Sequence, residues 1–463
     1  MQKTHLFLGA GLLLCALSGC TMAPRYLRPD MPVPAQLPVA DSRGQAGTDV
    51  SDIGWQTFYT DPGLRQAIAT ALENNRDLRA AALSVESYQA QYRIQRAALF
   101  PNLGANGTWS KQRTLASGQY VTGEMYSAAV GVTSYELDLF GRVRSLKAEA
   151  LEQYLGQVAT HRSAVISLVA ETARSYLSLL ADRELLAISQ DTFKSQGESF
   201  GLVQQRFESG IANSLEIAQS RTMLEQVRAS LAQYQLQSEQ DKNALNLLAG
   251  VAMPDPAGGQ RLEDHDLTLQ LPANLPSTVL LQRPDIQAAE HALKAANANI
   301  GAARAAFFPT ISLTGQAGYM APDFGDLFDS KSGVWAFTPS ISIPIFTGGR
   351  LTAQLDLAEI RKEAAVVNYE KAIQTAFREV ADGLAARKWL AERVAAQKAL
   401  VDAAQEYYKL ASFRYQEGID SFLTQLDAER SLFAARQTYV TLRLAQQNNQ
   451  VNLFKALGGG WQQ

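Results

Sequence analysis

Cysteine and histidine, the residues most often used as nucleophiles and metal ligands, are scarce in this chain. Its 463 residues contain two cysteines, Cys15 and Cys20, and four histidines, none of them paired at metal-ligand spacing. Beyond residue 20 the chain can therefore form neither a thiolate metal site nor a disulfide. The short motifs of phosphate-binding loops, serine hydrolases and dinucleotide-binding folds are also missing. We expect no enzyme activity, no cofactor and no metal.

Cys20 has a sequence context that predicts lipid attachment. Lys3 precedes an apolar run that ends in Leu17-Ser18-Gly19-Cys20. A basic start, a short apolar stretch and a small-residue cut site indicate a secretory signal over residues 1–19. The tetrapeptide resembles a bacterial lipobox, in which cleavage leaves an acylated cysteine, and two or more acyl chains anchor a protein stably. Thr21, in place of the aspartate that retains lipoproteins at the inner membrane, favours the outer membrane. The alternative is an ordinary signal with an incidental cysteine.

The charge balance argues against nucleic acid as a partner. Lys and Arg number 42 against 45 Asp and Glu, so the net charge is −3 and no basic excess can neutralise phosphates. Charged residues make up 19% of the chain, below the roughly 25% of a typical soluble domain. After the signal, no stretch of eighteen uncharged apolar residues occurs. Any membrane crossing is therefore expected to use strands.

The sequence contains an internal repeat with a fixed offset. Three pairs of segments match at a constant distance of 208 residues: 75–78 with 283–286, 97–101 with 305–309, and 206–211 with 414–419. A constant offset indicates a tandem duplication, with each copy forming the same supersecondary unit. Each copy is expected to contain a helix, two strands and two very long helices.

The long helices and the strands are predicted from two different periodicities. Residues 141–210 contain no proline and have an imperfect heptad pattern, which favours an antiparallel coiled-coil hairpin. Residues 335–343 alternate between apolar and small polar side chains, as outer-membrane strands do. Pro339 cannot donate to a central ladder, so we expect a β-bulge there. Loops are expected over residues 111–125 and 320–334, between the strands of each pair.

Four strands cannot close a barrel, so closure must come from several chains. Two copies would give a plugged eight-strand barrel, and three would give a twelve-strand barrel wide enough to conduct. Because both strand pairs leave and return to helices, all helices are expected on one side of the membrane.

With this plan and the lipobox, the chain resembles the TolC-like outer-membrane factors, and within them the lipidated OprM-type channels of multidrug tripartite pumps. The resemblance rests on four stretches in order, residues 136–142, 281–285, 301–309 and 455–461.

The resemblance implies a mainly α protein with membrane β-strands, closing as a trimeric twelve-strand barrel and an α-helical tunnel. The expected segments are a signal peptide (1–19), a lipidated arm (20–60), a first repeat (61–250), a linker (251–282), a second repeat (283–458) and a tail (459–463). In the first repeat the strands are expected near 101–110 and 126–137 and the helical hairpin near 141–249. In the second the strands are expected near 309–319 and 335–345 and the hairpin near 349–457. The arm, the linker and the tail are expected to build a small domain around the middle of the tunnel.

The resemblance also implies partners and a function. It implies a homotrimer that is anchored in outer-membrane lipid, with its helical tunnel in the periplasm. The implied partners are a periplasmic adaptor (membrane fusion) protein and an inner-membrane RND-type pump. The function implied is passive export of drugs and other small amphipathic compounds. Alternatives are a type I secretion duct and a lipid-anchored coiled-coil tether without a pore. An envelope hydrolase would need a carboxylate pair in a cleft, and nothing in the sequence marks one.

By the same resemblance, the periplasmic tip is closed by side chains near the hairpin turns. Leu423 and Asp427 would line the constriction, while Asp420 and Tyr415, facing Glu216, would hold the closed state. Thr424 stands where one family member has a second gate aspartate. The turns at Gly210 and Gly418 would form the adaptor-docking surface. From the residues alone, Asp420 and Asp427 also suit ordinary solvated or capping positions after a turn.

Overall fold

The computed structural model describes residues 21–38, 53–255, 261–264, 267, 269 and 275–461. The lipid-attachment prediction for Cys20 lies outside the described residues. Two compact units divide the chain, and helices α5 and α8 contribute residues to both. The first unit contains the strands, and the second contains the hairpin turns. The elements are α2 (Trp55–Phe58), α3 (Pro62–Asn74), α4 (Arg76–Ala97), β1 (Leu103–Ala116), β2 (Gln119–Leu137), α5 (Arg142–Glu208), α6 (Ser214–Ala249), η2 (Leu262–Asp264), η3 (Ser277–Gln282), α7 (Pro284–Ala305), β3 (Thr310–Ala321), η4 (Phe324–Asp326), β4 (Gly333–Ser342), α8 (Arg350–Gln416) and α9 (Phe422–Ala456).

The tandem duplication is visible in the helix boundaries. Helices α4 and α5 begin and end 208 residues before α7 and α8. The glycines that bound the long helices repeat at the same distance and all have positive φ: Gly141 with Gly349, Gly210 with Gly418, and Gly250 with Gly458. Glycine takes this left-handed conformation without steric cost, so the same turns are built twice.

Helices α5 and α8 each contain 67 residues, which corresponds to roughly 100 Å of helix. By length and composition, one window of α5 with at most two charged residues could cross a membrane. Because 61% of that window is buried inside the protein, we assign it to the packed interior of the helical part.

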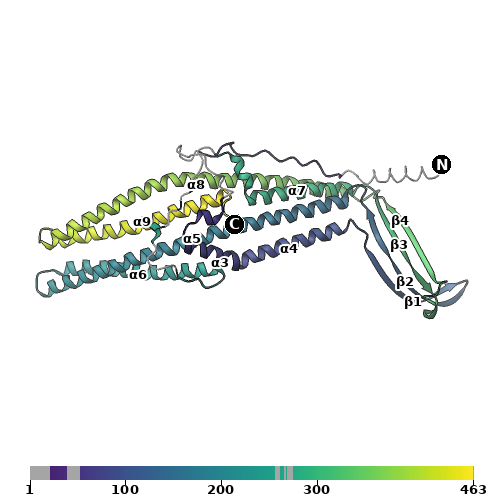
Figure 1. Cartoon of the computed structure of the whole chain (residues 1–463), viewed down its shortest axis with the longest axis horizontal. Coiled ribbons are helices and arrows are strands. Elements are labelled where there is room, and N and C mark those ends of the chain that lie inside the picture. Colours follow the sequence, from purple (N-terminus) through teal and green to yellow (C-terminus); the bar gives the residue numbers. More distant parts are fainter. Residues whose placement is uncertain are drawn as a thin grey trace. The chain divides into compact units, whose positions relative to one another are not determined.

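The four strands form one antiparallel sheet in the order β1-β2-β3-β4 (Figure 1). The register places Leu103 opposite Val132, Leu137 opposite Ile311, and Thr310 opposite Ser342. The start of β1, the end of β2, the start of β3 and the end of β4 therefore lie at the same end of the sheet. All four connections to helices leave from that end, as the sequence predicts.

The first strand pair is longer than the sequence analysis predicts, and the loop expected over residues 111–125 is wrong. Pairing continues through Lys111, opposite Glu124, to the pair of Ala116 and Gln119. The two turn residues, Ser117 and Gly118, both have positive φ, as in a type I′ hairpin turn. The ladder hydrogen bonds that extend this pair need no apolar face. The Lys111–Glu124 ion pair, 2.6 Å between Nζ and Oε1, suits directly opposed strand positions.

The bulge expected at Pro339 is also wrong, since β3 and β4 pair without interruption and Leu313 lies opposite Pro339. Within one chain β4 is an edge strand, where a proline is tolerated when its nitrogen faces away from the neighbour. The register shift lies instead in β2, between Val132 and Tyr135. There Ser134 has a φ of 53°, and its N–H donates to Thr314 Oγ1 at 3.2 Å.

In the second unit, part of the arm pairs with the end of the linker. The Leu37 N–H donates to the Leu275 carbonyl, and the Ser277 N–H donates to the Ala35 carbonyl. The first tail residues, Gly459 and Gly460, lie close to the Phe454 ring at the end of α9. That ring stacks on Phe58 of α2 with ring centroids 4.1 Å apart. Arg283, with a nearly buried side chain, donates to the Ala456 carbonyl at 2.8 Å and fixes that helix end.

Candidate functional site

The two hairpin turns have the same backbone construction. In the first, the Ile211 N–H donates to the Arg206 carbonyl at 2.8 Å, and in the second the Ile419 N–H donates to the Arg414 carbonyl at 2.9 Å. With Gly210 and Gly418 at positive φ, both are Schellman-type helix ends. The turns therefore have a hydrogen-bonded backbone, and they are short and exposed at the ends of the hairpins.

Each returning helix begins with a side-chain cap. Asn213 accepts a hydrogen bond from the Glu216 N–H at 3.0 Å and donates from its side chain to Glu216 Oε1 at 3.1 Å. Ser421 accepts from the Thr424 N–H at 3.4 Å. These contacts satisfy N–H groups that a helix start otherwise leaves free. In this chain Asn213 is therefore the N-cap of α6, and the Glu216 carboxylate is bonded to the side chain of that cap.

An apolar cluster joins the two hairpins behind the turns. It unites residues of α5, α6 and α9: Val203, Met223, Val227, Phe422, Leu426 and Phe433. Tyr415 and Ile217 pack against it while partly exposed. Burying these side chains holds the second hairpin against the first.

Tyr415 is also linked to the first hairpin by a polar contact. The Arg206 guanidinium donates to Tyr415 Oη at 2.7 Å, and its Cζ lies 5.3 Å from the centre of the tyrosine ring. Burial raises the pKa of Tyr415, which Arg206 counteracts and Glu216 reinforces. The sequence analysis missed Arg206. The repeat could have indicated it, because Arg206 is the counterpart of Arg414, the residue before Tyr415.

Asp420 is paired within its own turn. Its carboxylate accepts from Arg414 Nε at 2.7 Å and from Arg414 Nη2 at 3.0 Å. The hydrogen bond from Arg414 lowers the pKa of Asp420. Within one chain, the acceptor capacity of Asp420 is used to tie α8 to the turn that follows it.

Leu423 and Asp427 lie one helical turn apart on the exposed side of α9. The neighbouring Phe422 and Leu426 are buried in the apolar cluster, whereas Leu423 is 53% exposed. Among the described residues, Asp427 has no hydrogen bond or ion pair, and its side chain is exposed. The structure therefore brings Tyr415 and Phe422 to the inner face and leaves Leu423 and Asp427 free to face another chain or a tunnel.

The sheet has two unpaired edges and an exposed apolar surface. Among the described strands, β1 pairs only with β2, and β4 pairs only with β3. All ten residues of β4 are exposed, including Trp335 at 80%, Phe337 at 61% and Ile341 at 64%. Such a sheet is unfavourable in water, because its edges lack partners and its aromatic side chains lack cover.

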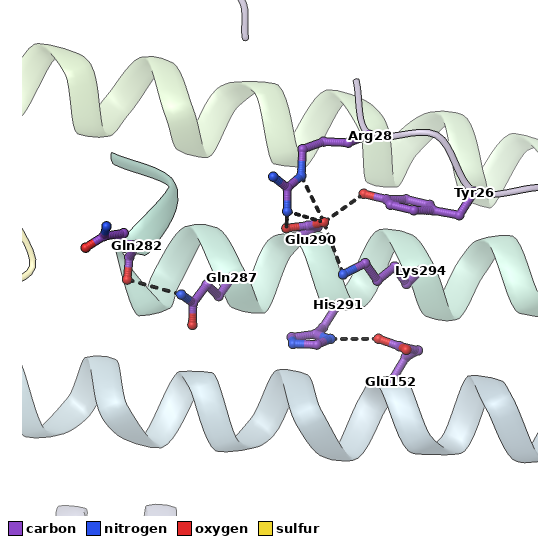
Figure 2. Close-up of polar contacts among 8 residues, drawn as sticks. All are labelled: Tyr26, Arg28, Glu152, Gln282, Gln287, Glu290, His291 and Lys294. Carbon is purple, nitrogen blue, oxygen red and sulfur yellow. Dashed lines mark hydrogen bonds and ion pairs between the residues drawn. The ribbon is translucent and has the colours of Figure 1, made fainter. Parts of the chain in front are cut away.

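The N-terminal arm is held on α7 by a buried carboxylate that the sequence analysis did not identify (Figure 2). Glu290 accepts from the Arg28 guanidinium at 2.9 to 3.1 Å, from Tyr26 Oη at 3.1 Å and from Lys294 Nζ at 3.1 Å. Burial alone would raise the pKa of Glu290, but hydrogen bonds from Lys294 and Arg28 hold it below its usual range. On the opposite side of α7, His291 Nδ1 lies 2.7 Å from Glu152 Oε2 of α5.

Comparison with known proteins is consistent with this arrangement. Two segments of the chain, residues 67–251 and 275–459, match the family model of the outer membrane efflux protein, and their bounds differ by the repeat distance of 208. The antibiotic efflux pump outer membrane protein ArpC of Pseudomonas putida is 50% identical over 453 residues, which cover 96% of this chain and 93% of that protein. The cation efflux system protein CusC of Escherichia coli is 43% identical over 449 residues, 97% of each chain.

Solved structures of outer-membrane channels are also similar to this chain over nearly its whole length. The open-state crystal structure of the Neisseria gonorrhoeae MtrE outer membrane channel has a TM-score of 0.87 at 40% identity, covering 96% of this chain and 99% of that one. The resemblance to TolC-like factors, the duplicated mainly helical fold with four strands, and the outer-membrane location are confirmed. The chain belongs to the outer membrane efflux protein family.

Proposed function

We propose that three copies of this chain form a channel that passively conducts antibiotics and other small amphipathic compounds out through the outer membrane. The observation that carries the proposal is the sheet, with its two unpaired edges and its exposed apolar β4. Pairing β1 of one copy with β4 of the next satisfies both edges, and three copies then supply twelve strands. Lipid covers the aromatic and aliphatic side chains that water cannot favourably solvate.

The anchor and the partners follow from the same arrangement. Acylated Cys20 and the arm that follows it hold the chain in outer-membrane lipid, with the helices in the periplasm. A periplasmic adaptor protein docks at the turns around Gly210 and Gly418, whose helix-end geometry presents a fixed surface. An inner-membrane RND-type pump supplies the compounds and the energy.

At the tip, the five predicted gate residues have distinct roles. Leu423 and Asp427, exposed on α9, meet their counterparts from the other two copies at the constriction. Tyr415 holds the second hairpin to the first through Arg206. Asp420 fixes the turn through Arg414, and Glu216 accepts from Asn213, the residue that caps α6.

Single-channel recording of the purified trimer in planar bilayers tests this proposal. We expect closed or low-conductance channels, and a higher open probability in Tyr415→Phe, which loses the acceptor for Arg206 but keeps the ring. Tyr407→Phe is the matched control, since Tyr407 lies exposed on α8 and forms no hydrogen bond among the described residues. Asp427→Asn should reduce cation preference, whereas Asp402→Asn, on exposed α8 surface, should not.

The absence of current from every variant would contradict the channel and favour a lipid-anchored tether. Equal open probabilities in Tyr415→Phe, Tyr407→Phe and the wild type would contradict the role of Tyr415 but not the channel itself.

A further inference from the structure

A buried carboxylic acid lies between the two hairpins, close to the candidate gate but not part of it. Glu429 of α9 is 7% exposed and borders a pocket of about 110 Å³. The pocket is formed by side chains of α5, α8 and α9: Asp191, Thr192, Ser195, Tyr408, Glu429, Leu432, Phe433 and Arg436. All of them belong to the second compact unit.

Glu429 has no ion-pair partner among the described residues. Ser195 Oγ donates to Glu429 Oε1 at 3.3 Å, and the Gln196 side chain lies beside the carboxyl group. The one cation that borders the pocket, Arg436, donates its Nη2 to Gln405 of α8. A carboxylate in this place would be buried without an ion-pair partner, which is strongly unfavourable.

The other titratable groups around the pocket do not stabilise a charged Glu429. Helix α5 contributes Asp191, which is acidic, and α8 contributes Tyr408, whose pKa burial and Glu429 both raise. Burial raises the pKa of Glu429 itself, and the neighbouring Gln196 amide and the hydrogen bond from Ser195 oppose that shift only in part. The neutral acid is therefore the form that suits the closed pocket.

The position of Glu429 gives its protonation state a mechanical consequence. On α9 it lies between Leu426, in the apolar cluster with α5 and α6, and Leu432, which packs with Ala404 of α8. Asp427 is two residues earlier on the same helix. A charge at Glu429, which is only 7% exposed, is better hydrated when α9 separates from α5, so ionisation favours separation of the two hairpins.

We propose that Glu429 is a proton-operated latch, whose neutral form keeps α9 against α5 and whose ionised form releases it. The local latch depends only on contacts within one chain, while its effect on channel opening rests on the proposed function. Acid conditions then favour the packed tip, and a rise in pH favours its opening.

Hydrogen–deuterium exchange of the full-length protein in detergent tests the latch directly. Peptides covering residues 191–196 and 426–433 are followed from pH 5 to pH 8, with rates corrected for the intrinsic pH dependence of exchange. In the wild type we expect protection to fall about tenfold as pH rises, since each pKa unit of difference corresponds to a tenfold change in the opening equilibrium. Glu429→Gln, a neutral isostere, should keep the protection of the acid form across the range.

Two further variants keep the test decisive. Glu429→Met, apolar and of similar length, should also remove the pH dependence if the glutamine variant folds poorly. Glu406→Gln, on exposed α8 surface, should keep the wild-type profile. The latch is wrong if wild-type protection is independent of pH, or if Glu429→Gln retains the wild-type slope.

Single-channel recording separates the latch from the proposed function. If open probability rises with pH in the wild type but not in Glu429→Gln, both stand. pH-dependent exchange without current in any variant would leave the latch and overturn the channel. Current with pH-independent exchange would overturn the latch alone.

Discussion

Replacing Glu290 by glutamine is expected to release the N-terminal arm. The substitution removes the charge that Arg28, Tyr26 and Lys294 share while it preserves side-chain shape. A hydrogen bond to a charged group contributes about 1.5–3 kcal/mol. Glutamine keeps one acceptor oxygen, and the Arg28 side chain is already 50% exposed, so we take about 2 kcal/mol. At 1.4 kcal/mol per factor of ten, the population with a detached arm rises about 30-fold.

Limited proteolysis measures this population. Trypsin cuts after Arg25 only when the arm leaves α7, while Pro29 protects the bond after Arg28. When the arm closes faster than it is cut, the cleavage rate follows the detached fraction. Glu359→Gln is the matched control, because Glu359 forms an ion pair with Arg304 of α7 at 3.1 Å without touching the arm. Equal cleavage rates in Glu290→Gln and the wild type would refute the reasoning.

Three further substitutions test separate parts of the structure. The Cβ added by Gly418→Ala would meet no atom within 4 Å, but the alanine would keep a φ of +74°. The resulting strain of about 1 kcal/mol should raise hydrogen exchange in the turn about fivefold. Unchanged exchange would contradict a strained turn at this position. Gly318→Ala would place its Cβ against the Ala128 backbone and so disrupt the pairing of β2 with β3. We therefore expect the band of the heat-sensitive folded trimer to disappear from gels. A normal trimer band would contradict the β2–β3 register. Burial, and then Asp241, raise the pKa of Asp182 to about 7. Because that value exceeds the unfolded one, the stabilisation is complete below pH 4 and is lost as pH rises through 7. The thermal midpoint should therefore fall less between pH 5 and 8 in Asp182→Asn than in the wild type, and equal slopes would contradict the assignment.

The helices could be predicted from the sequence because their signals are local and occur twice. Proline-free segments, apolar periodicity and boundary glycines such as Gly210 and Gly418 depend on neighbours within a few residues. The constant offset then makes each copy a check on the other. The same reasoning placed the starts of β1, β3 and β4 within two residues, since strand alternation is also local, but β2 begins at Gln119, seven residues before the expected start near 126.

The errors have physical causes that periodicity does not report. Strand pairing between residues 111 and 124 is stabilised by a two-residue turn and a cross-strand ion pair, and neither produces an apolar pattern. Pro339 fits the β3–β4 ladder opposite Leu313 without a shift of register, and this depends on the pairing partner rather than on the sequence of one strand.

Long-range polar contacts were beyond the sequence for a different reason. Arg28 and Glu290 lie 262 residues apart, and no spacing rule joins an arm to a helix at that distance. Glu429 looks in sequence like one more charged residue of an amphipathic helix. Only the packing of α9 between α5 and α8 shows that its carboxyl group is buried.

Cysteine labelling of β4 in whole cells tests the central claim most directly. With the proposed cleavage before Cys20 and acylation of its thiol, each introduced cysteine is the only free thiol, so the label reports on that position alone. The substitutions take two alternating sets of β4 positions: Trp335, Phe337 and Ile341 on one face, and Ala336, Thr338 and Ser340 on the other. A membrane-impermeant maleimide should label the second set, which lines a water-filled interior, and leave the first set in lipid unlabelled. Equal labelling of both sets would mean that the sheet is surrounded by water, and a shared barrel in the outer membrane would be contradicted.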